Sequence, residues 1–245
     1  MRRDAIQTLD SLETSYWWHI GRRAVIRGLV RAFVTLPEGA RILDLGCGTG
    51  RNVALLAGFG RAFGADQSPE ALAIGRGLGL AGRLVGAHAE HIPFRDGAFD
   101  LVTALDLLEH LEGDLAGLAE IRRVLRPGGF LLAAVPAYRF LWSEHDEALG
   151  HRRRYMASEL HQKLNTTGYV VVKRTYAISF AFPLIVAFRL WRGLFPPAGP
   201  LRASYVMLPG WLNATFAAFL ALEARLMRVM NLPLGTSIFV VARRA

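Results

Sequence analysis

Residues 42–50 of this 245-residue chain read Ile-Leu-Asp-Leu-Gly-Cys-Gly-Thr-Gly, and this stretch decides the fold class. Its apolar start is typical of a buried strand and its alternating glycines of a tight loop, and we expect a helix from about Asn52 to Gly58. Because glycine has no Cβ, such a loop can turn through positive φ and present bare amide groups to a ligand. The stretch therefore predicts a ligand site between a strand and a helix of an α/β protein.

The spacing of the glycines distinguishes between classes of ligand. Gly46, Gly48 and Gly50 form a GxGxG pattern, whereas the dinucleotide fingerprint places its third glycine one residue later, where this chain has Arg51. The spacing argues against a nicotinamide or flavin oxidoreductase, which stays open as an alternative. An ordinary strand-to-helix turn without a ligand is the second alternative.

Composition indicates a folded protein of a reducing compartment. Hydrophobic residues make up 52% of the chain and charged residues 20%, which is a globular balance. The single cysteine, Cys47, excludes an internal disulfide and a cysteine-based metal cage. No apolar run follows Arg2 and Arg3, so we expect no secretory signal and a cytoplasmic location. The net charge of +9 favours anionic partners, such as phosphorylated small molecules, lipid surfaces or nucleic acid.

A second predicted strand, residues 61–66, ends in the acid Asp66. Asp66 follows Gly46 by about 20 residues, the distance at which a carboxylate on the second strand reaches a ribose. A carboxylate has two acceptor oxygens, which suit the two hydroxyl donors of a ribose. Ser68 and Pro69 then have the pattern of a helix start.

Three later segments complete a family pattern. Residues 86–100 contain Ala-Glu-His-Ile-Pro-Phe and end in Ala-Phe-Asp, residues 101–111 form a strand followed by Leu-Leu-Glu-His-Leu at the start of a helix, and residues 125–135 form a Leu-Arg-Pro-Gly-Gly turn before a strand. With the glycine loop and Asp66, these segments closely resemble the class I S-adenosylmethionine-dependent methyltransferases of the small-molecule, "methyltransferase type 11"-like kind. The resemblance covers roughly residues 40–136. It implies a doubly wound, mostly parallel, seven-stranded Rossmann-like sheet with helices on both faces.

The resemblance also implies the cofactor, S-adenosylmethionine, with S-adenosylhomocysteine as the product. The glycine loop would hold its methionine part, with Asp44 below the loop, and Asp66 would bind the ribose. His88 stands where the family usually has an aspartate, so adenine recognition is expected to differ and to pass in part to the backbone of Ala89. The predicted cofactor-binding residues are Asp44, Gly46, Cys47, Gly48, Gly50, Asp66, Gln67, His88, Ala89, Glu90 and Leu105, joined by Tyr16 and Arg22.

Tyr16 and Arg22 belong to residues 1–36, which precede the first strand. Aromatic residues at 16–18 open an amphipathic helix that we expect to end near Phe33. Aromatic side chains at helical spacing usually pack in a core, so a helix packed on the sheet is one interpretation. The resemblance implies the other, a lid in which Tyr16 excludes water and Arg22 meets an anionic group.

Residues 137–155 follow the fifth strand and are expected to lie over the edge of the sheet where ligands bind. They contribute two of our three candidates for a general base, His145 and His151; the third is His110, in the Leu-Glu-His-Leu segment. A packing role for His110 and a salt-bridged lid for residues 137–155 are the alternatives. A metal set of His145, Asp146 and His151 was considered, and we expect no metal.

About 60 residues separate the sixth predicted strand, residues 169–175, from the seventh, residues 237–242. They predict an inserted apolar hairpin, with one helix from Pro183 to Leu194, a break at residues 196–200 and a second helix from Trp211 to Met230. The uncharged run of the first helix is too short to span a bilayer, and the second reaches the required length only if Pro209, Gly210 and Asn213 are counted, so we expect no span. Packing on the domain, a homodimer and peripheral contact with the inner face of a membrane remain alternatives. The predicted units are a lid (1–36), a core (37–176), the hairpin (177–234) and the last core strand (235–245).

The predicted function is methyl transfer from S-adenosylmethionine, in line, to O, N or C of a small or lipid-linked acceptor. A cofactor-binding module without catalysis is the alternative from another class. We expect no nucleic-acid substrate, because no Asn-Pro-Pro-Tyr or Asp-Pro-Pro-Tyr run follows the fourth strand to receive a flipped base.

Overall fold

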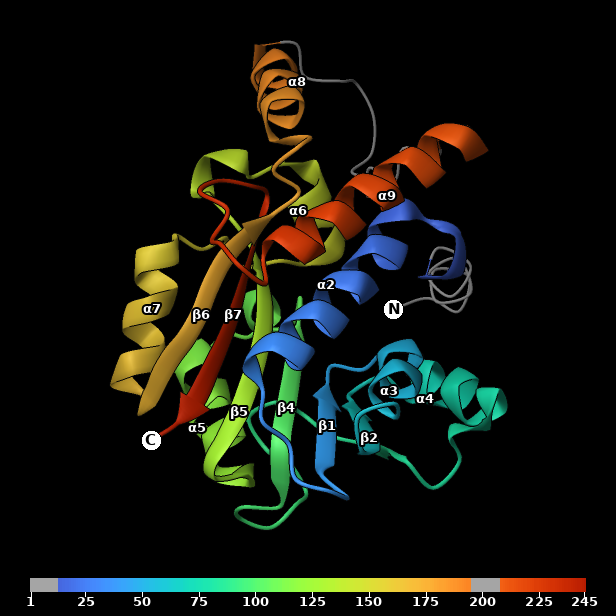
Figure 1. Cartoon of the computed structure of the whole chain (residues 1–245), viewed down its shortest axis with the longest axis vertical. Helices are drawn as coiled ribbons and strands as arrows, with labels where there is room; N and C mark the ends of the chain where they lie inside the picture. Colours follow the sequence, from blue (N-terminus) through green and yellow to red (C-terminus); the bar gives the residue numbers. More distant parts are fainter. Residues whose placement is uncertain (1–12, 195–207) are drawn as a thin grey trace.

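A seven-stranded sheet forms the centre of the computed structural model, which describes residues 13–194 and 208–245 (Figure 1). The strands lie in the order β3-β2-β1-β4-β5-β7-β6. Their bounds are β1 Arg41–Leu45, β2 Arg61–Asp66, β3 Leu84–Gly86, β4 Phe99–Leu105, β5 Leu125–Pro136, β6 Tyr169–Ala177 and β7 Ser237–Arg244. The main helices are α2 Trp17–Phe33, α3 Arg51–Leu56, α4 Pro69–Gly75, α5 Asp114–Val124, α6 Glu144–Leu149, α7 Ala157–Thr166, α8 Phe182–Leu194 and α9 Gly210–Leu226.

The strand directions bring the predicted site residues to one edge of the sheet. Strands β1, β2, β3, β4 and β5 pair in parallel, and β7 is antiparallel to both of its neighbours. Parallel strands end at the same edge, and in an open α/β sheet ligands bind outside those carboxyl ends. The doubly wound, mostly parallel sheet predicted from the sequence is thus confirmed.

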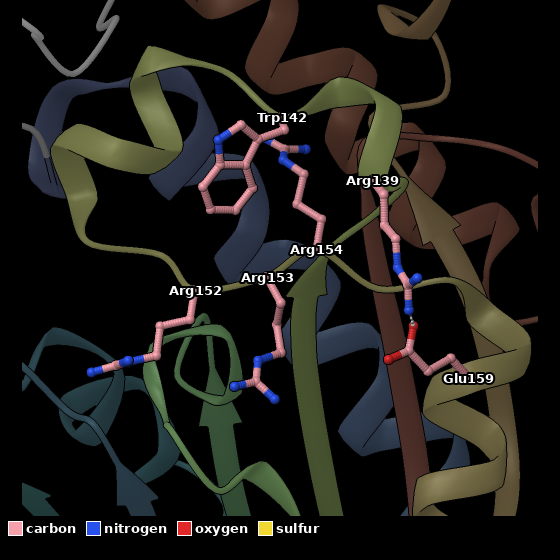
Figure 2. Close-up of a pocket in the computed structure, with 6 residues that line it drawn as sticks. All are labelled: Arg139, Trp142, Arg152, Arg153, Arg154 and Glu159. Carbon is pink, nitrogen blue, oxygen red and sulfur yellow. Dashed lines mark hydrogen bonds and ion pairs between the residues drawn. The ribbon is translucent and has the colours of Figure 1, made fainter.

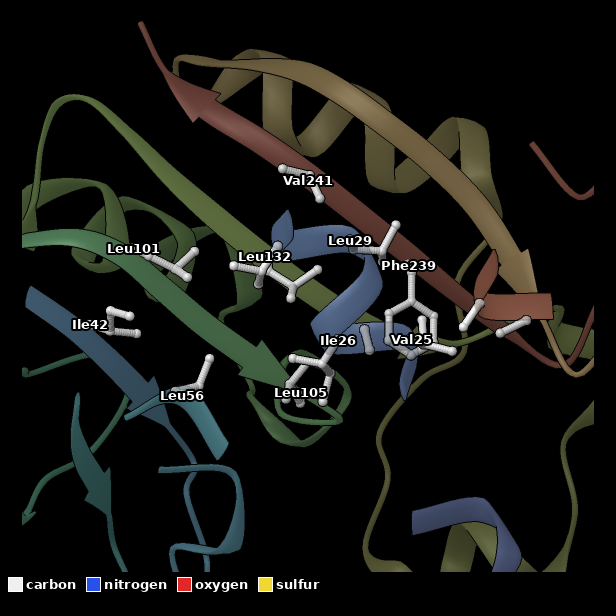
Figure 3. Packing of buried hydrophobic residues seen from close by; sticks show 14 of the residues in the cluster. Val25, Ile26, Leu29, Ile42, Leu56, Leu101, Leu105, Leu132, Phe239 and Val241 are labelled. Atoms are coloured by element: carbon white, nitrogen blue, oxygen red, sulfur yellow. The ribbon is translucent and has the colours of Figure 1, made fainter. Parts of the chain in front are cut away.

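Helices cover both faces of the sheet, each over its own apolar cluster. One cluster joins α2, α3 and α9 to the sheet, and Figure 3 shows Val25, Ile26 and Leu29 of α2 against Leu132 and Phe239 of the strands. The second cluster lies on the opposite face, under α5 and α7. Alternate residues of one strand therefore enter different clusters, as the twofold period of a strand requires.

The C-terminal helix α9 packs along the N-terminal helix α2 (Figure 1). A Cβ on Gly21 would lie 2.6 Å from Leu220, and one on Gly28 would lie 3.2 Å from the carbonyl oxygen of Ala224. These two glycines let the helix backbones approach closely. The predicted hairpin between α8 and α9 stays a prediction, because the expected break at residues 196–200 lies outside the described residues. None of the described helices combines the length and the apolar character that a bilayer-spanning helix needs.

One helix start was predicted wrongly. The sequence suggested that a helix begins at Leu107, but residues 108–110 form only a single 3₁₀ turn, and α5 begins at Asp114. Asp106 has a φ of 54°, which redirects the chain as it leaves β4. The segment between β4 and α5 is therefore a turn that carries Glu109 and His110.

Candidate functional site

The glycine loop after β1 has the backbone that its sequence predicts. Gly46, Gly48 and Gly50 have φ values of 73°, 54° and 84°, in the left-handed region that glycine enters without strain. A Cβ on Gly48 would meet no atom within 4 Å, so the described residues leave space beside this part of the loop. Cys47 points inward and is buried. The loop offers a ligand backbone groups beside open space.

Asp44 lies in β1 below the loop and is buried. The hydroxyl of Thr103 donates to Asp44 Oδ1 at 2.5 Å, but Asp44 Oδ2 has no hydrogen-bond partner among the described residues. Burial is the main cause that raises the pKa of this carboxyl from 3.8 to about 7. Near neutral pH, a cation at the loop would therefore meet an acid that is poised to ionise.

Asp66 at the end of β2 connects that strand to the loop. Its Oδ2 accepts from the backbone N–H of Gly48 at 2.8 Å, and its Oδ1 accepts from that of Ser68 at 2.8 Å. A carboxylate offers about four lone-pair sites, so both oxygens keep capacity for a further donor. Gln67, the next residue, is exposed. The predicted ribose ligand is thus rigidly held at the ligand edge.

The predicted base-binding residues form a turn after β3. The N–H of Ala87 donates to the carbonyl of Asp66 at 3.0 Å, and the N–H of His91 donates to that of His88 at 3.0 Å. Ala89 is buried inside this turn, and Glu90 is half-buried. Leu105, the last residue of β4, is buried at the same edge. The structure therefore brings together, at one edge of the sheet, the predicted residues that lie in or directly after β1, β2, β3 and β4.

The N-terminal segment contacts this edge at two points. Glu13 accepts a hydrogen bond from the hydroxyl of Thr49 in the glycine loop, and Arg22 of α2 forms an ion pair with Asp106, directly after β4. The ring of Tyr16 packs against those of Trp17 and His19, with centroids 5.8 and 6.3 Å away. Tyr16 and Arg22 thus belong to a segment that lies against the loop.

His19 was not among the predicted site residues. It is buried, and neither ring nitrogen has a partner among the described residues. Burial, with smaller contributions from Arg22 and Arg23, lowers its pKa to about 3. The ring is therefore neutral at physiological pH and keeps a donor and an acceptor free. The sequence gave no sign that His19 is buried without a partner, because it follows three aromatic residues at the start of a helix.

Two of the three candidate bases lie together. The rings of His110 and His151 meet edge to face with centroids 4.8 Å apart. His151 Nδ1 lies 2.9 Å from Asp146 Oδ1, which also accepts from Arg154 Nε at 2.8 Å. Asp146 thereby orients His151, and the ion pair and hydrogen bonds lower the pKa of Asp146 to about 2 against the opposing effect of burial.

His145 is placed differently, on the short helix α6. Burial is the main cause that lowers its pKa to about 4, so its ring is neutral at physiological pH. Its neighbour Asp146 faces His151 instead of sharing a ligand position with His145. Among the described residues, one group has ligand atoms close enough to share a metal ion, within 4.8 Å of one another: Glu109, His110 and His151. The set of His145, Asp146 and His151 does not form such a group.

Glu109 was also missed as a candidate. Its side chain is fully buried, and both carboxyl oxygens lack partners among the described residues. Burial first, and the charge of Asp106 second, raise its pKa well above its ordinary value. The Glu-His pair at 109–110 was visible in the sequence, but the expected helix would have placed it on a regular helical face.

A pocket of about 500 Å³ is lined in part by Arg152, the residue after His151, and by Arg154, which pairs with Asp146 (Figure 2). Its lining is rich in arginine: Arg139, Trp142, Arg152, Arg153, Arg154 and Glu159. Most of these charges are already paired, because Arg139 bridges to Glu159 at 2.8 Å, Arg154 to Asp146 at 2.8 Å and Arg153 to Asp114 at 3.3 Å. The residues that line the pocket carry more positive than negative charges, but most of the guanidinium groups already form ion pairs.

Comparison with known proteins identifies the type of domain. A family model described as a methyltransferase domain matches residues 43–133. A demethylmenaquinone methyltransferase of Mycolicibacterium vanbaalenii is 33% identical over 173 residues, which cover 69% of this chain and 71% of that protein. A demethylmenaquinone methyltransferase of Thermus thermophilus is 38% identical over 138 residues, 54% of this chain and 59% of that protein. These matches favour a methyltransferase over the oxidoreductase alternative.

A solved structure resembles the fold over nearly the whole chain. A chain of the complex between the Haloferax volcanii Trm112 methyltransferase activator and a methyltransferase superposes with a TM-score of 0.62, covering 96% of this chain and 92% of that one. The two sequences are 20% identical, so this likeness shows the fold alone. It extends beyond the residues matched by the family model, into the segments that contain α2 and α9.

Proposed function

The chain belongs to the class I S-adenosylmethionine-dependent methyltransferase family, and from this premise we propose that it methylates a small or lipid-linked acceptor of the hydroxylated-ring type. The observation that carries the proposal is the arrangement of the glycine loop between two acids. Gly48 faces open space, Asp66 holds the loop from β2, and Asp44 keeps a buried oxygen without a partner among the described residues.

This arrangement fits S-adenosylmethionine. The backbone of Gly46, Gly48 and Gly50 would hold the methionine part, and Asp44 would balance its ammonium. Asp66 would accept from the ribose hydroxyls, with Gln67, His88, Ala89 and Glu90 around the adenine. When bound, the cofactor supplies a methyl group on a positively charged sulfur, which an acceptor lone pair or an electron-rich ring carbon can attack.

The chain itself has to position the acceptor and exclude water. In this proposal the predicted lid before β1 covers the site, since its described residues Glu13 and Arg22 contact the glycine loop and the turn after β4; its residues 1–12 lie outside the described part of the chain. A base is needed only where the acceptor carries a proton. The neighbouring rings of His110 and His151 are the first candidates, and His145 is the third.

The class of acceptor is suggested by the relatives and by the surface. Two relatives are named for a demethylated menaquinone, a ring with an apolar tail. Helices α8 and α9 expose large apolar side chains, namely Leu184, Phe188, Leu190, Trp191, Trp211, Phe219 and Leu222. In this proposal the inserted segment, residues 177–234, receives the apolar tail of such an acceptor at a membrane surface.

Three experiments test the proposal. Labelled S-adenosylmethionine is incubated with the protein and with hydroxylated naphthoquinols that carry short or long tails; labelled product is expected, and its absence over a broad acceptor panel would count against methyl transfer to this class. Alanine replacements of His110, His145 and His151 should lower turnover without changing cofactor affinity. The third experiment mixes the protein with anionic vesicles and measures its oligomeric state by light scattering. A protein that stays in the soluble fraction and is a dimer would assign the exposed apolar side chains of α8 and α9 to a homodimer interface instead.

A further inference from the structure

We infer that Glu109, His110 and His151 bind one divalent transition-metal ion of the Zn²⁺ class. Each of the three offers a ligand atom, and these atoms lie within 4.8 Å of one another. The residues come from two segments that are joined by a backbone hydrogen bond, in which the N–H of Arg152 donates to the carbonyl of Glu109 at 2.8 Å. The cluster is thus built from parts that already hold each other in place.

The carboxyl of Glu109 needs a partner that the described residues do not provide. It is fully buried, with both oxygens unpaired. The two guanidinium groups that influence it electrostatically are committed elsewhere, because Arg22 pairs with Asp106 and Arg154 with Asp146. A buried carboxylate is costly unless it is paired or coordinates a metal. A cation between Glu109 and the two imidazoles would meet that requirement.

His151 is oriented as a metal ligand. Its Nδ1 lies 2.9 Å from Asp146 Oδ1, and in the neutral tautomer that donates to this carboxylate the lone pair is on Nε2. Metal-bound histidines commonly donate their other N–H to a carboxylate, which fixes the tautomer and the ring orientation. Asp146 is itself fixed by Arg154 and by the backbone N–H of Ser143, at 2.8 and 2.9 Å. The support behind this ligand is therefore complete.

The chemistry of the set selects the kind of ion. Two imidazole nitrogens and one carboxylate oxygen suit Zn²⁺, whereas Mg²⁺ and Ca²⁺ prefer oxygen ligands. Tetrahedral bonds of about 2.0–2.1 Å place ligand atoms roughly 3.4 Å apart. The ligand atoms here lie within 4.8 Å of one another, so side-chain movements of about an ångström would bring them to bonding distance of one ion. Three protein ligands leave a fourth position open, as in catalytic zinc sites.

The fourth coordination position could bind a hydroxyl of the acceptor, and this part of the inference rests on the proposed function. Leu107, two residues before Glu109 in the chain, contacts the glycine loop, since a Cβ on Gly46 would lie 3.0 Å from Leu107 Cδ1. An acceptor hydroxyl on the ion would release its proton to solvent more readily, because a bound metal lowers the pKa of an attached oxygen. His110 and His151 would then act on the acceptor through the ion instead of taking its proton directly.

Metal binding is measured on the full chain without a histidine tag, after treatment with a chelator. Titration with ZnCl₂ against a chromophoric chelator should show one equivalent bound with a Kd in the micromolar range or tighter. Glu109→Gln and His151→Ala should each weaken binding at least tenfold. His161→Ala, on α7 and outside the cluster, should bind Zn²⁺ as the wild type does.

Binding that is absent, or that is equally strong in Glu109→Gln and His151→Ala, would overturn the inference. Circular dichroism shows whether each variant is folded, and Co²⁺ absorption of the wild type supplies a second readout, since tetrahedral nitrogen and oxygen ligation gives intense visible bands. S-adenosylhomocysteine binding is measured on the same samples. Cofactor binding without metal binding contradicts only the metal site, whereas metal binding without cofactor binding contradicts only the proposed function.

Discussion

Arg22 of α2 forms an ion pair with Asp106, the residue that leaves β4 with a φ of 54°. The side chain of Arg22 is 9% exposed and that of Asp106 30% exposed, so the pair is largely shielded from water. Since the N-terminal helix and the ligand edge of the sheet meet here, the pair is one polar link between the predicted lid and the site, and the hydrogen bond between Glu13 and Thr49 is another.

The first prediction concerns the strength of this link. A double-mutant cycle with Arg22→Met and Asp106→Asn should give a coupling free energy above about 1 kcal/mol in thermal or denaturant unfolding, because shielded charges attract more strongly than solvated ones. The exposed pair of Arg139 and Glu159, whose arginine side chain is 71% exposed, is the control and should stay below that value. Equal coupling in the two pairs would contradict the shielding argument.

The second prediction concerns the packing of α2 on α9. Gly21→Ala places a methyl group 2.6 Å from Leu220 and should cost about 1–3 kcal/mol of unfolding free energy through overpacking. Gly77→Ala is the matched control, because a Cβ there meets no atom within 4 Å and its φ is not positive. Denaturant midpoints measure both. A neutral Gly21→Ala would mean that the two helices are not in close contact in solution.

The third prediction is a pH dependence from Asp44. Its pKa is raised by burial to about 7 from 3.8, so between these values the folded state holds a proton that the unfolded state releases. Stability from this group is therefore greatest below about pH 4 and is lost as the pH rises to about 7. In Asp44→Asn that loss is absent.

The unfolding free energy of the wild type minus that of Asp44→Asn should therefore fall by an amount on the order of 4 kcal/mol between pH 4 and pH 7. Urea titrations at several pH values measure the difference. A difference that stays constant, or rises with pH, would show that Asp44 is ionised in the free protein.

The fourth prediction concerns the space beside Gly48. Gly48→Ala adds a methyl group where the cofactor is expected and should weaken S-adenosylhomocysteine binding at least tenfold. It also strains a residue at φ 54°, by about 1–2 kcal/mol. Gly128→Ala is the control. It carries the same kind of strain at φ 74°, its Cβ would meet no atom within 4 Å, and it lies near the start of β5, away from the ligand edge. Binding measured by calorimetry should be unchanged in that control, and equal weakening in both variants would contradict the assigned ligand space.

The sequence predicted the parts of the fold that local patterns encode. The glycine loop, the acid at the end of β2 and six of the strands follow from short apolar runs and turn residues, whereas β3, Leu84–Gly86, was not located from the sequence. The helices near 183–194 and 211–230 were also placed within a few residues. Such features depend on neighbours in the chain, which a sequence displays directly.

The missed features depend on contacts between distant residues. Trp17 N–H donates to Asn213 Oδ1 at 2.8 Å, and no local pattern connects residues so far apart in the chain. Glu109 was expected on a helix, but it lies in the turn after the left-handed Asp106, buried and grouped with His151. Similarly, the sequence offered Asp146 only as part of a metal set that we did not expect to be occupied, and it gave no sign that Asp146 contacts His151 and Arg154.

The central claim is that the loop after β1 and the acid after β2 hold two parts of one S-adenosylmethionine molecule, and calorimetric titration with S-adenosylhomocysteine tests it most directly. The wild type should bind one equivalent. Asp66→Ala should bind about 10–100-fold more weakly, as expected for loss of hydrogen bonds to a charged group, and Glu38→Ala, an exposed acid in the turn before β1, should not change. No heat with the wild type, or the same Kd in Asp66→Ala, would contradict the claim.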